Sequence, residues 1–360
     1  MKLEHRIGQL LIIGLPGPQF GPEEKELLET VQPGGVVLSA KNIDNAQQVV
    51  DLTSVIRTSV LVPPVIAIDQ EGGPVDRLKS IFSAMPSPDL LRASKDASAA
   101  ARLGEITAEA LRTLGFNLNL APVIDISVDD SVANGLQGRY LGSANAEVAR
   151  LSGAYLEGLQ HGGIVGVGKH FPGLGASTVD PHFILPQIDT PREQMVNQVI
   201  QPYTELFSKI NARLNAVMVG HAHYTAFDGH APLPASLSRN IVTGLLREEL
   251  DFKGLAITDD LEMGAITTVR PAADAAIAAI EAGNDMVMVA GSPEAARAAW
   301  ESMVRAANDG RITKQRISKS FDNIARVKSM LAPPHTLSES AISRLKDRIS
   351  ELNVALQQVR

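Results

Sequence analysis

Two short stretches near the middle of the chain bring together residue types that transfer protons. The first, KHFPGLG, spans Lys169–Gly175, and the second, DPH, spans Asp180–His182. Both follow an apolar run at 164–167, so a strand there would deliver a cation, two imidazoles and a carboxylate at its carboxyl end. The Asp-x-His spacing lets the carboxylate orient and polarise the imidazole, as a proton-transferring histidine requires. We therefore expect Asp180 and His182 to act as a pair.

Polar side chains also follow four other apolar runs, in the groups Asp69 and Glu71, Asp125, His221 and His223, and Asp259 and Asp260. One such residue alone can be an ordinary polar group at the start of a loop, but repetition after several runs indicates a shared site. Carboxylates and arginines at such a site suit a ligand rich in hydroxyl groups. Glycoside hydrolysis needs an anion beside the anomeric carbon and a proton donor at the leaving oxygen. Asp259 and His182 could fill these two roles.

The elements that must position these residues follow from the alternation of apolar and amphipathic segments. Eight short apolar runs predict strands at Leu10–Gly14, Gly35–Leu38, Val65–Ile68, Leu118–Pro122, Ile164–Gly168, Ala216–Gly220, Leu255–Thr258 and Met286–Ala290. Stretches with a 3.6-residue period predict helices between them, including Ala46–Arg57, Ala99–Leu114, Glu147–Gln160, Glu193–Lys209 and Ala273–Ala282. Near-continuous apolar strands separated by helices indicate a covered parallel sheet. We predict an α/β fold with a (β/α)8 TIM-type barrel, because no Gly-x-Gly-x-x-Gly turn supports the rival doubly wound sheet.

Composition excludes several functional classes. Hydrophobic residues are 44% and charged residues 20% of the 360 residues, as in an ordinary globular protein. A formal charge of −7 and the lack of a basic stripe argue against a nucleic-acid partner. The chain has no cysteine, and no window approaches the roughly 20 apolar residues of a membrane span. Its early apolar run ends at Pro16, so we interpret that run as a first strand and expect a cytoplasmic protein.

Motifs along nearly the whole chain resemble those of the β-N-acetylhexosaminidases of glycoside hydrolase family 3, a single-domain bacterial type. The motifs are GQLL at 8–11, DQEGG at 69–73, APVID at 121–125, the 169–182 loop, and ITDDL at 257–261. This resemblance implies a cofactor-free, metal-independent retaining exo-β-N-acetylglucosaminidase. It also implies β-linked N-acetylglucosamine glycosides as substrates, most simply peptidoglycan-derived muropeptides in cell-wall recycling.

The same resemblance assigns roles to individual residues. Asp259, directly after Thr258, corresponds to the family's nucleophile, which forms a covalent glycosyl-enzyme. Asp180 and His182 correspond to its acid/base dyad. The molecule that accepts the sugar in the second step is water or, as a hypothesis, phosphate. Positions that bind the N-acetylglucosamine ring in relatives correspond to Asp69, Arg77, Arg139, Lys169 and His170.

Three positions depart from the family pattern. Leu174 replaces a second loop histidine, Pro74 replaces an arginine after Glu-Gly-Gly, and Pro181 replaces a serine inside the dyad. We expect Leu174 and Pro74 to affect loop closure or the aglycone side, and so to bear on the muropeptide preference more than on the reaction. Pro181 fixes its own φ and biases Asp180 toward an extended backbone, which predicts a stiffer dyad loop.

Two alternatives stay open. The His-x-His spacing of His221 and His223 after a strand resembles zinc-hydrolase barrels, in which alternate side chains reach one metal. The first alternative is therefore a metal-dependent amidohydrolase-type enzyme that uses His170, His221, His223 and an aspartate. The second is a catalytically inactive sugar-binding relative, which is disfavoured because Asp259 and the dyad are both present.

The chain changes character after Pro333 and Pro334. Apolar residues then recur at alternating spacings of three and four, at Ile342, Leu345, Ile349, Leu352 and Leu356. This pattern predicts an amphipathic helix that packs on the outside of the barrel or pairs in a homodimer. We accordingly divide the chain into a catalytic barrel at 1–332 and a helical extension at 333–360, and expect a monomer or a homodimer formed through this helix.

Overall fold

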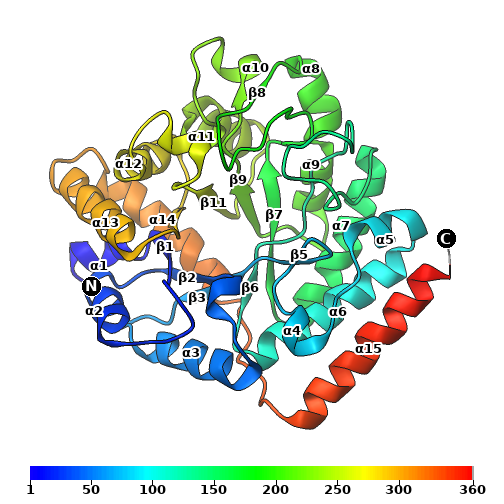
Figure 1. The fold of residues 1–360 in the computed structure, drawn as a ribbon. Coiled ribbons are helices and arrows are strands. Elements are labelled where there is room, and N and C mark those ends of the chain that lie inside the picture. Colours follow the sequence, from blue (N-terminus) through cyan, green and yellow to red (C-terminus); the bar gives the residue numbers. More distant parts are fainter. Residues whose placement is uncertain (359–360) are drawn as a thin grey trace.

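The computed structural model, which describes residues 1–358, contains a closed barrel of eight parallel strands (Figure 1). The strands are β1 (Leu11–Gly14), β2 (Gly35–Leu38), β3 (Val65–Ile68), β6 (Leu118–Asn119), β7 (Val165–Phe171), β9 (Ala216–Val219), β11 (Leu255–Asp260) and β12 (Met286–Val289). β1 pairs with β2 on one side and with β12 on the other, which closes the barrel. Each predicted apolar run forms one barrel strand, so the predicted fold is confirmed.

Strands β7 and β11 extend further than the apolar runs indicate. β7 includes Lys169 and His170, and β11 includes Asp259. The regular part of β6 ends early, because Pro122 has no N–H to donate to a neighbouring strand. The chain still runs beside β7, since the N–H of Lys169 donates to the carbonyl of Pro122 at 3.1 Å. Several candidate site residues therefore lie on strand ends that are held by backbone hydrogen bonds.

Helices form the outer layer of the barrel (Figure 1). The principal helices that follow the strands, in chain order, are α2 (Pro22–Val31), α3 (Ala46–Thr58), α6 (Ala97–Thr113), α7 (Asn145–His161), α9 (Gln201–Ser208), the π-helical η4 (Asn240–Glu249), α12 (Ala272–Ala282) and α13 (Pro293–Asn308). Side-chain caps fix where some of them begin. Asn45 accepts from the N–H of Gln48 at 3.0 Å before α3, and Asp96 accepts from that of Ser98 at 2.8 Å before α6. α1 (Leu3–Gly8) precedes the barrel and α14 (Lys314–Lys328) follows it.

The predicted helix at Glu193–Lys209 is interrupted. It consists of α8 (Arg192–Gln194), a π-helical turn η2 (Met195–Val199) and α9. Pro202 is the second residue of α9, and a proline is tolerated in a first helical turn but not in a helix interior. The proline therefore explains why a new helix begins at this point.

Short elements occupy the connections after the strands. They are η1 (Ala40–Asn42), the hairpin β4 (Gln70–Gly72) and β5 (Val75–Asp76), α4 (Lys79–Phe82), α5 (Pro88–Ser94), β8 (Gln187–Ile188), β10 (His223–Tyr224), α10 (Thr225–Asp228), η3 (Ala235–Leu237) and α11 (Gly264–Thr267). None of the helices within residues 1–358 combines the length and apolar character needed to cross a bilayer.

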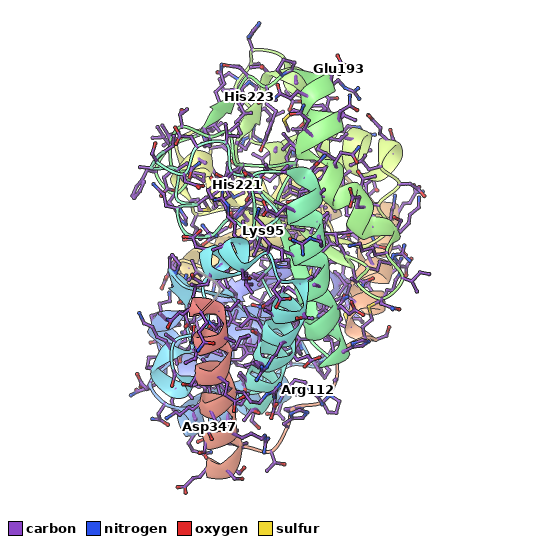
Figure 2. The ribbon with its side chains drawn as sticks, turned by 90° about the vertical axis from the view of Figure 1, so that its right-hand side faces the viewer. Lys95, Arg112, Glu193, His221, His223 and Asp347 are labelled. Atoms are coloured by element: carbon purple, nitrogen blue, oxygen red, sulfur yellow. The ribbon has the colours of Figure 1, made fainter. Side chains whose placement is uncertain are left out.

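The C-terminal helix α15 (Glu339–Gln357) lies along α6 and also contacts α4 and α5 (Figures 1 and 2). Of its predicted apolar residues, Leu345, Ile349, Leu352 and Leu356 are buried there and Ile342 is half-buried, while Ala341 is buried as well. Charged pairs border this contact, since Arg344 and Arg348 of α15 both reach Glu109 of α6. The apolar side is thus covered within one chain, and pairing with a second copy stays a prediction.

Candidate active site

A cavity of about 230 Å³ opens among the carboxyl ends of the barrel strands. Every residue to which the family resemblance assigned a role lines it: Asp69, Arg77, Arg139, Lys169, His170, Asp180, His182 and Asp259. Of the other polar residues expected at a shared site, Glu71 lines the cavity, whereas Asp125, His221, His223 and Asp260 do not. β7 and β11 supply three of the residues with an assigned role, and the connections after β3, β6 and β7 supply the others. The barrel therefore brings together residues that are far apart in the sequence.

Lys169 belongs to a network of charged side chains. Its Nζ lies 2.5 Å from Oδ1 of Asp69 and 2.7 Å from Oε1 of Glu71, and its side chain is 3% exposed. Burial by itself would lower the pKa of Lys169, but the two carboxylates raise it above its ordinary value. The ammonium group therefore stays charged and holds Asp69 in place.

Glu71 connects Lys169 to Arg139. The Arg139 guanidinium donates to both carboxylate oxygens of Glu71, from Nε at 2.8 Å and from Nη2 at 2.9 Å. Burial would raise the pKa of Glu71, but Lys169 and Arg139 lower it to about 2. The sequence analysis placed Glu71 with Asp69 among the residues of a shared site but assigned it no role. Its i+2 spacing from Asp69 is the signal that it faces the same side, because alternate residues of an extended segment face one side.

Asp125 plays a similar part for His170. This fully buried carboxylate accepts from the backbone N–H of His170 at 3.1 Å, from its Nδ1 at 2.7 Å and from the N–H of Leu174 at 2.6 Å. Because a carboxylate only accepts, Nδ1 carries the proton, and Nε2 is the ring nitrogen left for another partner. The sequence placed Asp125 at a strand end without a role, and the structure shows that it orients His170.

Asp259 lines the cavity, and its neighbour Asp260 does not. Burial would raise the pKa of Asp259, but the imidazoles of His170 and His221, the N–H of Asp260 and Lys169 together lower it. For Asp260 burial prevails and raises the pKa to about 6, although its carboxylate accepts from the N–H groups of Glu262 and Ala290. These environments keep Asp259 ionised and give Asp260 a structural part.

Asp180 and His182 form a hydrogen-bonded pair at the mouth of the cavity. Oδ1 of Asp180 lies 2.7 Å from Nδ1 of His182 and accepts from the backbone N–H of the same residue at 2.9 Å. The His182 side chain is 60% exposed, whereas that of Asp180 is 23% exposed. Asp180 therefore orients the His182 ring through Nδ1, which leaves Nε2 of His182 to exchange a proton.

Arg77 is a cation of the cavity whose guanidinium group has a hydrogen-bond donor without a partner. Its Nε is buried and has no hydrogen-bond partner within residues 1–358. A buried donor without a partner is costly unless a bound molecule satisfies it. Arg77 is thus available to a ligand, whereas Arg139 is engaged by Glu71.

His221 and His223 do not assemble a metal site with His170. Nε2 of His221 donates to the carbonyl of Asp260 at 3.0 Å, so its Nδ1 accepts from the Ser236 hydroxyl at 2.8 Å. Nδ1 of His223 lies 3.3 Å from the backbone nitrogen and oxygen of Leu233, and Figure 2 labels His221 and His223 at different heights of the molecule. Within residues 1–358, no three His, Asp or Glu side chains are grouped as metal ligands. The side chains of His221 and His223 also do not line the cavity.

The three departures from the family pattern occupy different places. Leu174 is 3% exposed and lines the cavity. Pro181 lines it too, between the members of the pair. Pro74 lies in the β4–β5 turn against Gly138 and does not line the cavity. Leu174 is therefore placed to contact a molecule in the cavity, whereas Pro74 is not.

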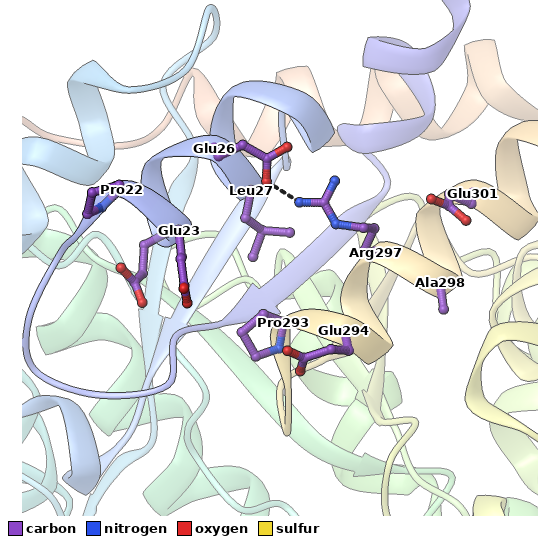
Figure 3. Close-up of a pocket in the computed structure, with 10 residues that line it drawn as sticks. Pro22, Glu23, Glu26, Leu27, Pro293, Glu294, Arg297, Ala298 and Glu301 are labelled. Carbon is purple, nitrogen blue, oxygen red and sulfur yellow. Dashed lines mark hydrogen bonds and ion pairs between the residues drawn. The ribbon is translucent and has the colours of Figure 1, made fainter.

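A second, wider hollow of about 540 Å³ lies outside the barrel between α2 and α13 (Figure 3). Half of its ten lining residues are acidic, namely Glu23, Glu24, Glu26, Glu294 and Glu301. Arg297 on α13 pairs with Glu26 on α2, as Figure 3 shows. It shares no lining residue with the first cavity.

Residues 2–327 match the family described as "Glycosyl hydrolase family 3 N terminal domain". Two similar curated proteins are the β-hexosaminidases of Idiomarina loihiensis and Alkalilimnicola ehrlichii. They are 31% and 35% identical to this chain, over 78% and 79% of its length and over 83% and 81% of their own.

Solved structures of the same family have the same fold. A family 3 β-N-acetylglucosaminidase from Paenibacillus sp. str. FPU-7 aligns with 98% of the chain, and this chain covers 69% of it, with a TM-score of 0.90 and 32% identity. A fungal multi-domain family 3 β-N-acetylglucosaminidase aligns with 99% of the chain, with a TM-score of 0.93 and 29% identity. This chain spans 43% of the length of that fungal protein. The protein belongs to glycosyl hydrolase family 3 and is a glycoside hydrolase.

Proposed function

We propose that the protein is a retaining exo-β-N-acetylglucosaminidase that removes terminal N-acetylglucosamine from β-linked glycosides. The observation that carries the proposal is one cavity lined both by the ionised carboxylate of Asp259 and by the hydrogen-bonded pair Asp180 and His182. A retaining glycosidase needs such a nucleophile and such a proton donor on opposite sides of the scissile bond.

In the first step Asp259 attacks the anomeric carbon and forms a glycosyl ester as the bond to the leaving oxygen breaks. His182 delivers a proton from Nε2 to that oxygen, and Asp180 stabilises the imidazole through Nδ1. In the second step the neutral Nε2 removes a proton from water, which attacks the anomeric carbon and releases Asp259. The proton balance closes, since His182 begins and ends the cycle protonated.

The sugar ring would be held by the remaining charged residues of the cavity. Asp69 presents a carboxylate fixed by Lys169, and Arg77 presents an unpaired donor. Carboxylates accept from sugar hydroxyls, and guanidinium groups donate to sugar oxygens. Relatives named β-hexosaminidase and β-N-acetylglucosaminidase support N-acetylglucosamine as the sugar. The finer proposal of cytoplasmic muropeptide recycling rests on the sequence resemblance.

The deciding experiment compares p-nitrophenyl N-acetyl-β-glucosaminide with p-nitrophenyl β-glucoside. We expect turnover of the first and little of the second, and Asp259→Ala should reduce turnover by several orders of magnitude, because water cannot replace a positioned carboxylate. A 5-fluoro glycoside should leave a covalent adduct on Asp259, detected by peptide mass spectrometry. Binding of the sugar without turnover would favour the inactive relative, and an adduct on Asp260 would move the nucleophile by one residue.

A further inference from the structure

The loop that carries Asp180 and His182 is docked against the segment that follows Asp259. The N–H of Gly264 donates to the carbonyl of His182 at 2.9 Å, and the N–H of Ala265 donates to that of Pro181 at 3.0 Å. Gly264 and Ala265 begin α11, so two N–H groups of its first turn, which have no partner inside the helix, are used. The strand end that bears Asp259 thus continues directly into the support of the pair.

Gly264 permits this docking by its lack of a side chain. A Cβ at this position would lie 2.1 Å from the carbonyl oxygen of Phe183 and 2.4 Å from its carbonyl carbon. Both atoms belong to the backbone of the dyad loop, so no rotation of a side chain could relieve the overlap. Gly264 does not have the left-handed φ that would itself favour glycine. The close approach of the dyad loop is therefore the reason that position 264 requires a glycine.

A second glycine supports the loop from its other side. A Cβ at Gly135 would lie about 3.0 Å from the Asp180 carboxylate, and Gly135 adopts a φ of +82°. The carbonyl of Gly135 accepts from Nη1 of Arg139 at 2.7 Å. The neighbouring Asn134 donates to the carbonyl of Ser177 in the same loop at 3.1 Å. Contacts on two sides thus restrict where Asp180 and His182 can lie.

We infer that Gly264 is a positioning residue for the acid/base pair: its close contact with the 181–183 backbone sets the place of His182 over the cavity. This inference rests on the proposed function. A Cβ at Gly264 must displace the dyad loop, while β11, which carries Asp259 and ends four residues before Gly264, stays paired with β9 and β12. The rate of proton transfer should then fall more than the rate of nucleophilic attack, because proton transfer depends on the position of the imidazole.

The test compares Gly264→Ala with Gly17→Ala, at which a Cβ has no neighbour within 4 Å. For glycosides with poor leaving groups, Gly264→Ala should lower kcat/KM by about 10- to 100-fold, part of the roughly 10²–10⁴-fold that a positioned proton donor contributes. With a 2,4-dinitrophenyl leaving group, kcat/KM should change little, and azide should restore kcat by attacking the glycosyl-enzyme. Gly17→Ala should behave as the wild type in every assay.

Ala265→Pro tests the same docking through a hydrogen bond, since it removes the donor to the Pro181 carbonyl. It should reproduce the dependence on the leaving group, and thermal unfolding should show that each variant is folded. Wild-type behaviour of folded Gly264→Ala on poor leaving groups would overturn the inference, as would equal losses on both kinds of substrate. The proposed function fails separately, if the wild type does not turn over N-acetylglucosaminides or if His182→Ala shows no dependence on the leaving group.

Discussion

At the scale of single residues, the site is organised by two buried carboxylates that have no part in the proposed bond cleavage. Glu71 holds Lys169 and Arg139, and Asp125 holds His170. Each carboxylate compensates the burial of a cation or fixes a tautomer, which a solvent-exposed group would not need. These anions therefore fix the positions of Lys169, Arg139 and His170 in the cavity.

The pair of Asp180 and His182 makes a prediction about leaving groups. His182→Ala should reduce hydrolysis of poor leaving groups by about 10²–10⁴-fold and that of activated aryl glycosides far less, because a stable phenolate departs without a proton. Steady-state kinetics across a series of leaving-group pKa values measures this. Asp180→Asn should give a milder loss, since orientation of the ring partly survives. Equal losses along the series would move the acid/base role to another group such as His170.

Glu71 makes a prediction about stability. Its 2% exposed side chain neutralises two cations, so Glu71→Gln should lower the free energy of unfolding at pH 7 by about 3 kcal/mol, the usual cost of breaking a buried pair. The folded-state pKa of about 2 lies below the ordinary value of 4.5, so the stabilisation is present above pH 4.5 and is lost as pH falls toward 2. Urea unfolding between pH 3 and 7 should show a steeper acid loss for the wild type than for the variant. Parallel pH curves would contradict the assignment.

At the scale of elements, strand ends and helix starts place the site more firmly than loops do. The ends of β7 and β11 carry Lys169, His170 and Asp259 in the barrel wall. The dyad loop is restrained by docking on α11 and by its contacts with Asn134 and Gly135. The structure thus places the proposed nucleophile on a strand and the proposed acid/base pair on a supported loop.

The C-terminal helix makes a prediction about cooperativity. Leu345 on α15 is fully buried, so Leu345→Ala should lower the free energy of unfolding by about 2–5 kcal/mol if α15 unfolds together with the barrel. Val354 on the same helix is 51% exposed, and Val354→Ala is the matched control, with an expected change within about 0.5 kcal/mol. Urea unfolding followed by Trp300 fluorescence and by circular dichroism compares the two. A separate early transition in Leu345→Ala would show that 333–360 unfolds as a unit of its own.

At the scale of the whole molecule, the two ends of the barrel sequence meet below the site. Nζ of Lys328, the last residue of α14, donates to Oε1 of Gln9 at 3.0 Å, just before β1. Gln9 in turn donates to the carbonyl of Gln32 at 2.7 Å. This contact joins α14 to the first turn of the barrel and closes its amino-terminal end, opposite the cavity.

Lys328 makes a prediction about alkaline pH. Burial lowers its pKa to about 8 from 10.5, so the folded state binds this proton more weakly than the unfolded state. Below pH 8 the folded protein carries the full cost of the buried charge, and its stability should rise as pH increases from 8 toward 10.5. Lys328→Met should remove this increment, so the difference in stability between variant and wild type should shrink over that range. Thermal unfolding at pH 7.5, 8.5 and 9.5 measures it, and a constant difference would contradict the assignment.

The sequence by itself determined the barrel and the edge of it at which the cavity lies. Apolar runs and 3.6-residue periods are local patterns, and they identified each barrel strand from β1 to β12. Because parallel strands end at one edge, side chains after those runs had to meet, and Asp69, Lys169 and Asp259 do. The break between α8 and α9 was missed, although Pro202 was visible, because the period continued across it.

Only the tertiary structure decided which groups support the site. Glu71 and Arg139 are 68 residues apart, Asp125 and His170 are 45 apart, and no local pattern joins them. Gly264 likewise matters only because the backbone at Phe183 approaches it after the barrel has closed. The sequence of an amphipathic helix such as α15 determines which side of the helix is apolar, but not which element covers that side. These contacts depend on the arrangement of whole elements in space, whereas periodicity records only the neighbours along one element.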